Sequence, residues 1–347
     1  MTVDATSLHR LQGVSRYGLL AAIPLLWAAT QLFEPARWFP LLVSLVLFGI
    51  PHGSLDLAVG QKLAGGKRSD RGPGFTALLF VGYVALAGLY LLVWFGAPAL
   101  ALGFFLLLTA WHWGSGDASW MARQGYGHSP GTVGFLLDAG WRGAFPMALP
   151  LLLHPEVTRS VLAGTLGLFG PVTGLEGLTL LLVSLGVIGA ACLGLVLWMP
   201  AHRGNRLREA GMLVALFLIL DPVAAIGLYF LFWHSLPHCG RLVDLLQPAA
   251  RPSVGWFAPL VAIHRRGLPY TAGALAILGG LAVYLFGPQG AALNPLAVLG
   301  IYLVLLAIVT LPHAVVTACW DFGSTLSHTV VCSQSTPKPA TLPVAQP

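Results

Sequence analysis

The sequence has little charge: only 9% of its 347 residues are Asp, Glu, Lys or Arg, against about 25% in an ordinary globular protein. Hydrophobic residues make up 56% of the chain. This composition excludes a disordered chain, a coiled coil and an ordinary soluble enzyme. Although the length alone would allow two soluble domains, the composition predicts one integral membrane domain.

Lysine is especially scarce, and the only three, Lys62, Lys67 and Lys338, lie outside the buried parts of the apolar runs. A retinal Schiff base needs a lysine at membrane depth, so the sequence excludes a retinal-binding rhodopsin. The four cysteines form no C-x-x-C pair and no disulfide-scaffold pattern. We interpret Cys239 as a buried free thiol rather than a metal ligand.

Long apolar runs dominate the sequence, and a membrane span needs roughly 20 such residues. Ten candidate runs cover residues 17–33, 38–58, 75–95, 97–120, 132–153, 177–199, 207–220, 222–239, 270–286 and 295–320. They predict an all-α, polytopic membrane bundle of about ten transmembrane helices, or eight if the short runs are re-entrant. We divide 207–239 at Asp221-Pro222, because proline disfavours helical geometry in the residue before it.

The charges fall in the links between these runs, although the chain has a formal net charge of +6. In the ten-span topology every cation-rich link lies on one side, which should be the cytoplasm. The lipid bilayer, and no nucleic acid, is therefore the expected partner of these cations. We expect a cytoplasmic segment at 1–16, a transmembrane catalytic domain at 17–332 and a disordered, proline-rich tail at 333–347, with the protein multi-pass in the inner (plasma) membrane.

Five of the eleven histidines lie inside apolar runs: His52, His112, His234, His238 and His313. Ionisable side chains at membrane depth are costly and mark functional sites. His52, His112, His238 and His313 lie near the cytoplasmic ends of even-numbered spans. His234 lies in the same span as His238, so all five imidazoles are expected at about the same depth in the membrane. The other six histidines lie in links or termini, and we assign them no specific role.

His234 and His238 are four residues apart, which places them on one helix face about 5–6 Å apart at Cβ. Helices use this spacing to offer two imidazoles to one metal ion. One histidine from each of two further helices would complete a four-imidazole site. Imidazole suits Zn, Cu, Fe and Ni, so the ligand type leaves the metal open.

An aspartate follows each histidine motif: Asp56, Asp117, Asp244 and Asp321. Ligating histidines usually donate their second N–H to a carboxylate or a carbonyl, a role open to Asp56 and Asp117. The alternative is that these aspartates cap helices or pair with cations such as Arg241. Proline precedes three of the histidines, and it either frees a carbonyl one turn earlier for an imidazole or simply kinks the helix.

Aromatic residues accompany the histidine motifs, among them Trp111, Trp113, Phe232 and Trp233. They form either an interfacial aromatic belt or the wall of a cleft for a flat, apolar substrate. The second interpretation implies a substrate that comes from the bilayer through a lateral opening.

Two reaction classes remain after these exclusions. A zinc-dependent intramembrane lipid hydrolase, ceramidase-like, needs a base, and all four glutamates lie away from the histidines, so Asp56 or Asp117 would have to serve. Four imidazoles on iron(II) would instead leave up to two positions for dioxygen and substrate, which fits oxidation of a molecule without a hydrolysable group. A diiron desaturase or hydroxylase would need more histidine pairs, and usually more ligands, than these five histidines provide. A non-enzymatic protein, such as a transporter or a haem-binding electron carrier, would use the histidines as proton relays or axial ligands.

Four short motifs occur in one order: residues 51–56 (PHGSLD), 112–114 (HWG) with Asp117, 234–238 (HSLPH) and 311–313 (LPH). Together they resemble the bacterial β-carotene 15,15′-dioxygenase family. The resemblance covers most of the apolar chain. The N-terminal extension and the proline-rich tail have no counterpart that we can place.

The resemblance implies that dioxygen cleaves the central double bond of β-carotene and gives two molecules of all-trans-retinal, which a rhodopsin would receive. It also implies iron(II), Fe(2+), held by the catalytic residues His52, His112, His234 and His238. His313 is left as a fifth ligand, a substrate-side residue or a hydrogen-bond partner of a ligand.

Overall fold

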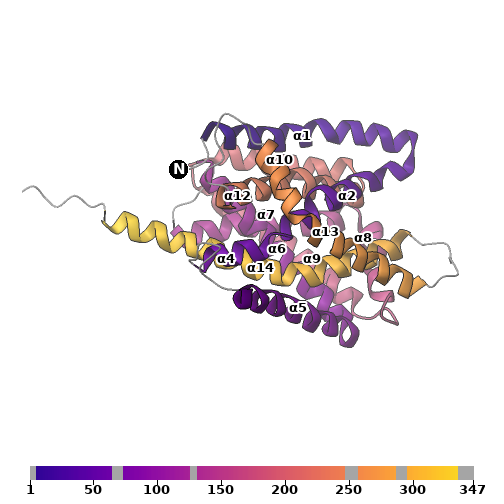
Figure 1. Ribbon diagram of the computed structural model, residues 1–347. Helices are drawn as coiled ribbons and strands as arrows, with labels where there is room; N and C mark the ends of the chain where they lie inside the picture. The colour runs from indigo at the N-terminus through magenta and orange to yellow at the C-terminus, as the bar shows by residue number, and fades with distance from the viewer. Residues whose placement is uncertain (1–4, 65–72, 126–130, 247–256, 287–294, 335–347) are drawn as a thin grey trace, which may run out of the picture.

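The computed structural model describes residues 5–64, 73–125, 131–246, 257–286 and 295–334, and every regular element in these ranges is helical. The elements in chain order are α1 (Ala5–Leu32), η1 (Glu34–Trp38), α2 (Phe39–Ser44), η2 (Leu45–Gly49), α3 (Ile50–Gly53), α4 (Asp56–Leu63), α5 (Pro73–Gly96), α6 (Pro98–Arg123), α7 (Gly131–Leu153), α8 (Pro155–Gly167), α9 (Leu175–Trp198), α10 (Arg203–Ile219), α11 (Pro222–Leu228), η3 (Tyr229–Ser235), α12 (Leu236–Leu246), α13 (Phe257–Phe286) and α14 (Pro295–Gln334). In Figure 1, α1 lies along one edge of the bundle and α5 along the opposite edge, with α6, α7 and α14 between them.

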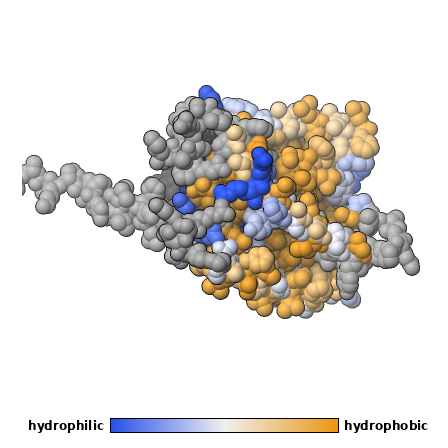
Figure 2. Space-filling view, viewed as in Figure 1, coloured by the Kyte–Doolittle hydropathy of each residue, from blue (hydrophilic) through white to orange (hydrophobic). Residues whose placement is uncertain are grey.

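Long apolar helices account for much of this bundle. Among the described residues, four helical stretches are long and apolar enough to cross a membrane: Gly74–Gly96, Pro98–Arg123, Leu175–Trp198 and Pro295–Asp321. The face in Figure 2 is broadly hydrophobic, as expected of a surface in contact with lipid. The all-α membrane fold is therefore supported, whereas the ten predicted spans stay a prediction.

The run 38–58 is not the single span that we expected. It divides into η1, α2, the π-helical turn η2, and the short helices α3 and α4. Pro51 lacks the N–H that would bond to the carbonyl of Leu47 one turn earlier, and Nε2 of His264 donates to that carbonyl instead. This pairing confirms that a proline beside a histidine motif frees a carbonyl for an imidazole, although the imidazole is one to which we assigned no role.

The predicted break at Asp221-Pro222 is confirmed. Helix α10 ends at Ile219 and α11 begins at Pro222, where the Asp221 side chain accepts a hydrogen bond of 2.9 Å from the N–H of Val223. A side chain that caps a helix start offsets the interruption of the backbone hydrogen bonds.

Several helix boundaries differ from the apolar runs. Helix α1 begins at Ala5, so the boundary placed after residue 16 lies inside a helix. Helix α13 begins at Phe257 and includes two arginines that we placed in a link, and α8 was not predicted. Of the tail predicted to be disordered, residues 335–347 lie outside the described residues. Apolar runs mark the lipid-crossing part of a helix, and amphipathic turns extend beyond it.

Helices α6 and α7 approach so closely that only glycine fits at two positions. A Cβ on Gly114 would overlap the carbonyl oxygen of Ala139, and a Cβ on Gly143 would overlap that of Ala110. Small residues allow such backbone contact between membrane helices. Because Gly114 follows His112 and Trp113 on α6, this contact fixes the depth and rotation of both side chains.

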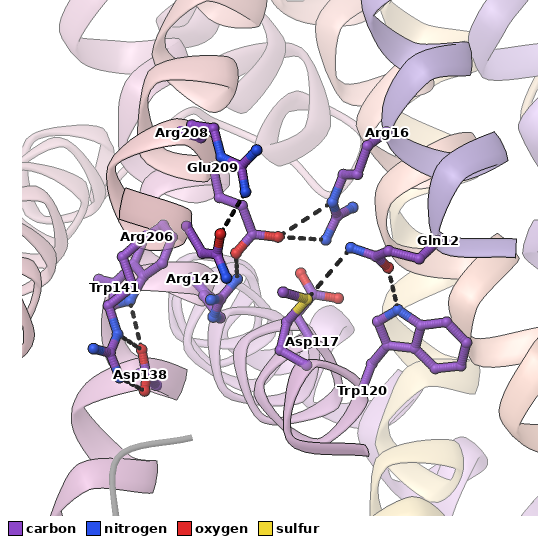
Figure 3. A network of polar contacts seen from close by, with 12 residues as sticks. Gln12, Arg16, Asp117, Trp120, Asp138, Trp141, Arg142, Arg206, Arg208 and Glu209 are labelled. Carbon is purple, nitrogen blue, oxygen red and sulfur yellow. Dashed lines mark hydrogen bonds and ion pairs between the residues drawn. The ribbon is translucent and has the colours of Figure 1, made fainter. Parts of the chain in front are cut away.

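A buried network of ion pairs joins α1, α7 and α10 (Figure 3). Glu209 of α10 accepts hydrogen bonds from Arg16 of α1 (3.0 and 3.2 Å) and from Arg142 of α7 (2.6 Å). Asp138 of α7 pairs with Arg206 of α10 at 2.9 Å. All five side chains are buried, so each charge depends on its partner in place of water.

We expect Gly143→Ala to destabilise the fold by about 1–3 kcal/mol, the usual result of overpacking a close contact. Gly82→Ala on α5 is the matched control, since open space surrounds that position. Thermal unfolding in detergent should show a lowered midpoint for the first variant and an unchanged or raised midpoint for the second. Equal midpoints would mean that the two helices can separate without loss of stability.

We also expect Glu209→Gln to lower the free energy of unfolding by about 3–5 kcal/mol, because two buried guanidinium groups lose their shared carboxylate. Glu176→Gln is the control: its partner is Arg159, but the Glu176 side chain is 82% exposed, so the change should have little effect. Unfolding in a denaturing detergent would measure both. A Glu209→Gln protein as stable as the control would contradict this role of the network.

Candidate metal centre

Four of the five predicted histidines have described side chains, and the fold brings them together. They are His112 on α6, His234 on η3, His238 on α12 and His313 on α14, and all four are buried. The ring of His112 lies centrally, with centroid distances of 4.8 Å to His313, 5.1 Å to His234 and 6.2 Å to His238. Three parts of the chain that are distant in sequence, α6, the consecutive elements η3 and α12, and α14, therefore deliver imidazoles to one buried place.

His52, the fifth, lies on α3, and its side chain is outside the described residues. The backbone of this turn nevertheless lies beside the cluster. A Cβ on the adjacent Gly53 would be 3.7 Å from Nδ1 of His313. The turn that carries His52 is thus a neighbour of the other imidazoles.

The pair His234 and His238 does not sit on the regular α-helix that we expected. Residues Tyr229–Ser235 form a π-helical segment that ends just before Pro237, which cannot donate a backbone hydrogen bond. The rings still lie 6.1 Å apart and nearly parallel, at 25°. Single π-helical turns inside α-helices are frequent at functional sites.

Two of the predicted aspartates bond to imidazoles, but each bonds to a histidine from another helix. Nδ1 of His313 lies 2.8 Å from Oδ1 of Asp56, and Nδ1 of His234 lies 3.4 Å from Oδ1 of Asp117. A carboxylate can only accept, so both ring nitrogens act as donors. The sequence left this role open to Asp56 and Asp117 without assigning either of them to a particular histidine, and their bonds link the motifs pairwise across helices.

The other two aspartates pair with arginines, as the alternative interpretation held. Asp244 lies 3.3 Å from Arg123, and Asp321 forms an ion pair with Arg241. Arg241 also stacks over the ring of Trp320, 4.4 Å from its centroid. The Arg241 pair lies near the cluster, since the ring of Trp320 is also 6.1 Å from that of His238, whereas the Arg123 pair lies farther along α12 and is partly exposed.

Three hydroxyl groups complete the surroundings of the imidazoles. Tyr83 donates to Oδ2 of Asp56 (3.1 Å), and Tyr229 donates to Oδ2 of Asp117 (3.0 Å). Thr317 donates to the carbonyl of Ala314, so its oxygen accepts from Nδ1 of His112 at 3.3 Å. Neither Tyr83 nor Thr317 was predicted. Each is a lone hydroxyl in an apolar run, and the group to which it bonds lies on another helix, Asp56 of α4 for Tyr83 and His112 of α6 for Thr317.

This donor set suits a metal ion of the kind that imidazole binds. Hydrogen bonds at Nδ1 in three of the rings make Nε2 the nitrogen with which each would coordinate. Rings bound at about 2.1 Å around one ion have centroids about 4.6–6.5 Å apart, and the measured separations lie within this range. Among the described side chains no three donor atoms yet surround a common point, so coordination requires the rings to turn inward.

The predicted aromatic residues occupy different surroundings. Trp113 lies 5.5 Å from the His234 ring and is buried, and Trp233 is buried under the guanidinium of Arg16. Phe232 is partly buried, whereas Trp111 is 41% exposed. Their role as a substrate cleft therefore stays a prediction.

Comparison with known proteins identifies the family. The family model described as β-carotene 15,15′-dioxygenase matches residues 43–321. The chain is 32% identical to "probable β-carotene 15,15′-dioxygenase Blh" of Halobacterium salinarum, over 87% of this chain and 89% of that protein. It is 28% identical to the β-carotene 15,15′-dioxygenase of uncultured marine bacterium 66A03, over 59% of this chain and 70% of that protein.

A third relative, "probable β-carotene 15,15′-dioxygenase Brp" of Halobacterium salinarum, is 28% identical over 81% of this chain and 82% of that protein. No solved structure matches the fold. The family match begins after α1 and η1 and includes the positions of all five predicted histidines, which confirms the family indicated by the four motifs. The chain thus belongs to the β-carotene 15,15′-dioxygenase family, whose enzymes cleave β-carotene to retinal.

Proposed function

We propose that this chain cleaves the central double bond of β-carotene with dioxygen at a single iron(II) ion, and that His52, His112, His234 and His238 hold the iron. The observation that carries this proposal is the cluster of buried imidazoles in a chain of a dioxygenase family. When bound, iron would supply the chemistry that activates dioxygen. His313, held by Asp56, is available as a further ligand or as a group facing the substrate.

The protein groups around the cluster have separate tasks in this proposal. Asp117 and Thr317 bond to Nδ1 of His234 and His112, which leaves Nε2 of each ring as the nitrogen that would coordinate once the rings turn inward. Tyr229 and Tyr83 in turn hold the two carboxylates in place. Apolar walls exclude water, which protects a reactive oxidant from side reactions.

β-Carotene offers no hydrogen-bonding group, so its central bond must be positioned by the shape of the site alone. The substrate and dioxygen both dissolve in the bilayer, and both would reach the centre from lipid. We further infer an inner-membrane protein with the histidine cluster toward the cytoplasm, because the cation-rich links follow the spans that carry the histidines. Retinal released into the same bilayer would be available to a rhodopsin.

The zinc-dependent lipid hydrolase is not favoured by the site. Its base would have to be Asp56 or Asp117, but both carboxylates already accept hydrogen bonds from an imidazole and a tyrosine. Family membership independently assigns oxidative cleavage.

We expect His238→Ala to abolish retinal formation and to lower the iron content of the purified protein, because one ligand of the proposed site is lost. Expression in a β-carotene-producing bacterium, with retinal measured by chromatography and iron by elemental analysis, tests this. His202→Asn is the control: His202 is exposed and has φ of 60°, a conformation that asparagine tolerates. Wild-type retinal and iron in His238→Ala would refute the ligand assignment.

We expect Asp117→Asn to weaken iron binding by about 10–100-fold, since a carboxylate that supports a ligand is lost, while activity returns at saturating iron. Metal titration of the purified variant, followed by a retinal assay at each iron concentration, separates the two effects. If Asp117 were a general base, activity would stay low at every metal concentration. Asp244→Asn, which affects a partly exposed pair with Arg123, is the matched control.

A further inference from the structure

An apolar pocket leads from the surface of the bundle to the histidine cluster. We propose that it binds one arm of the carotenoid, from the central double bond to the terminal ring; this proposal rests on the proposed function. The pocket, called here the side pocket, lies among η2, α3, α4, α5, α13 and α14, and its cavity volume is about 170 Å³. Its wall includes Phe80, Tyr83, Tyr270, Ala274, Tyr302 and His313.

The side pocket has a lipid-facing mouth and a buried floor. Phe80 on α5 and Tyr270 on α13 are 49% and 48% exposed, whereas Asp56 and His313 at the inner end are each 4% exposed. Helices α5 and α13 both pack against α14, and no extensive packing between α5 and α13 is found among the described residues. An opening between two helices at the apolar surface admits a hydrocarbon from the bilayer without passage through water.

One continuous face of α14 forms the length of the pocket. Its lining residues on this helix follow the spacing of a single helical stripe: Tyr302, Leu305, Leu306, Val309, Thr310 and His313. The eleven residue steps from Tyr302 to His313 rise about 16 Å along the helix, comparable with one polyene arm and its ring. A carotenoid arm aligned with this stripe would have its central bond at His313 and its ring beside Tyr302.

The chemistry of the lining favours a hydrocarbon. Its polar groups near the cluster already have partners: Ser54 donates to the carbonyl of Pro51 (2.6 Å), Thr310 donates to that of Leu306 (2.6 Å), and Tyr83 donates to Asp56. A ligand in this part of the pocket needs no hydrogen-bonding groups of its own. The cavity of about 170 Å³ holds a hydrocarbon section about the size of one ring, since a cavity of about 150 Å³ binds benzene, so a complete arm also requires side chains at the lipid-facing mouth to move outward.

The end of the side pocket that is far from the histidine cluster contains one polar group without a partner among the described residues. Tyr302 is buried, and its hydroxyl has no hydrogen-bond partner among the described residues. Burying a hydroxyl without a partner is unfavourable, so a ligand group that pairs with it would be favoured. We assign Tyr302 as the residue that lets the pocket accept a hydroxylated ring as well as the plain ring of β-carotene.

Filling the pocket from α13 tests the binding site. Ala274→Trp places an indole in the pocket, and Ala276→Trp, on the exposed side of the same helix, is the matched control. The iron-loaded full chain in lipid nanodiscs is titrated with β-carotene without dioxygen, and binding is read from the visible circular dichroism that an achiral polyene acquires in a chiral site. We expect at least about tenfold weaker binding for Ala274→Trp and wild-type binding for Ala276→Trp.

The smaller Ala274→Val keeps the test decisive if the tryptophan variant fails to fold, and it should give an intermediate loss of binding. Wild-type binding by a folded Ala274→Trp protein would overturn the proposal. Admission of dioxygen then separates this result from the proposed function. If Ala274→Trp weakens β-carotene binding but the wild type forms no retinal, the proposed reaction is refuted and the pocket assignment stands. If the wild type and Ala274→Trp both form retinal and bind β-carotene equally well, the pocket assignment is refuted and the reaction stands.

Tyr302→Phe tests the orientation of the arm in the same titration. With a carotenoid that bears a hydroxyl on its ring, removal of the tyrosine hydroxyl should weaken binding about three- to tenfold, the value of one hydrogen bond. Binding of β-carotene should stay the same or strengthen, because the variant no longer buries a hydroxyl that has no hydrogen-bond partner. Equal losses for both carotenoids, or no loss for either, would refute the placement of the ring at Tyr302.

Discussion

Pairing of buried polar side chains across helices is the constraint on which this structure depends. In an apolar bundle, a carboxylate or guanidinium without a partner costs several kcal/mol, so each such group must find one inside the protein. Glu209 joins α10 to α1 and α7, Asp117 joins α6 to η3, and Asp56 joins α4 to α14. These contacts are few, but each connects segments that are distant in sequence. Together they determine which helices are neighbours, and hence which imidazoles meet.

Irregular helical segments position the histidine side chains next to their hydrogen-bond partners. The π-helical segment before Pro237 sets the position of His234 relative to His238, and the broken run around Pro51 brings α3 beside His313. Regular helices through both regions would turn these side chains by a fraction of a helical turn. The missing N–H groups of the prolines make the irregular geometry the less costly one. The same residues that interrupt the helices thus give the cluster its shape.

The sequence predicts the fold class and the histidines of the candidate site better than it predicts the side chains to which those histidines bond. Low charge and long apolar runs predict an all-α membrane protein, and histidines inside those runs are conspicuous because their burial is costly. The sequence does not tell which carboxylate meets which imidazole, because Asp56 and His313 are far apart in the chain and no local pattern connects them. Tyr83, Thr317 and the side pocket are missed for the same reason. Helices such as α8 and the start of α13 are missed because their amphipathic turns have no apolar run.

The side pocket lies at only one side of the histidine cluster, beside His313, while Trp113 lies beside His234 at the other. β-Carotene is symmetric about its central bond, but the protein that surrounds it is not. One half of the substrate would lie along α14 with an opening toward lipid, and the other half would lie in different surroundings. Two chemically identical retinal molecules would then leave with different dissociation rates. When product release is slower than the chemical step, the slower departure sets turnover, and the catalytic rate then reports on a single exit route rather than on the average of two.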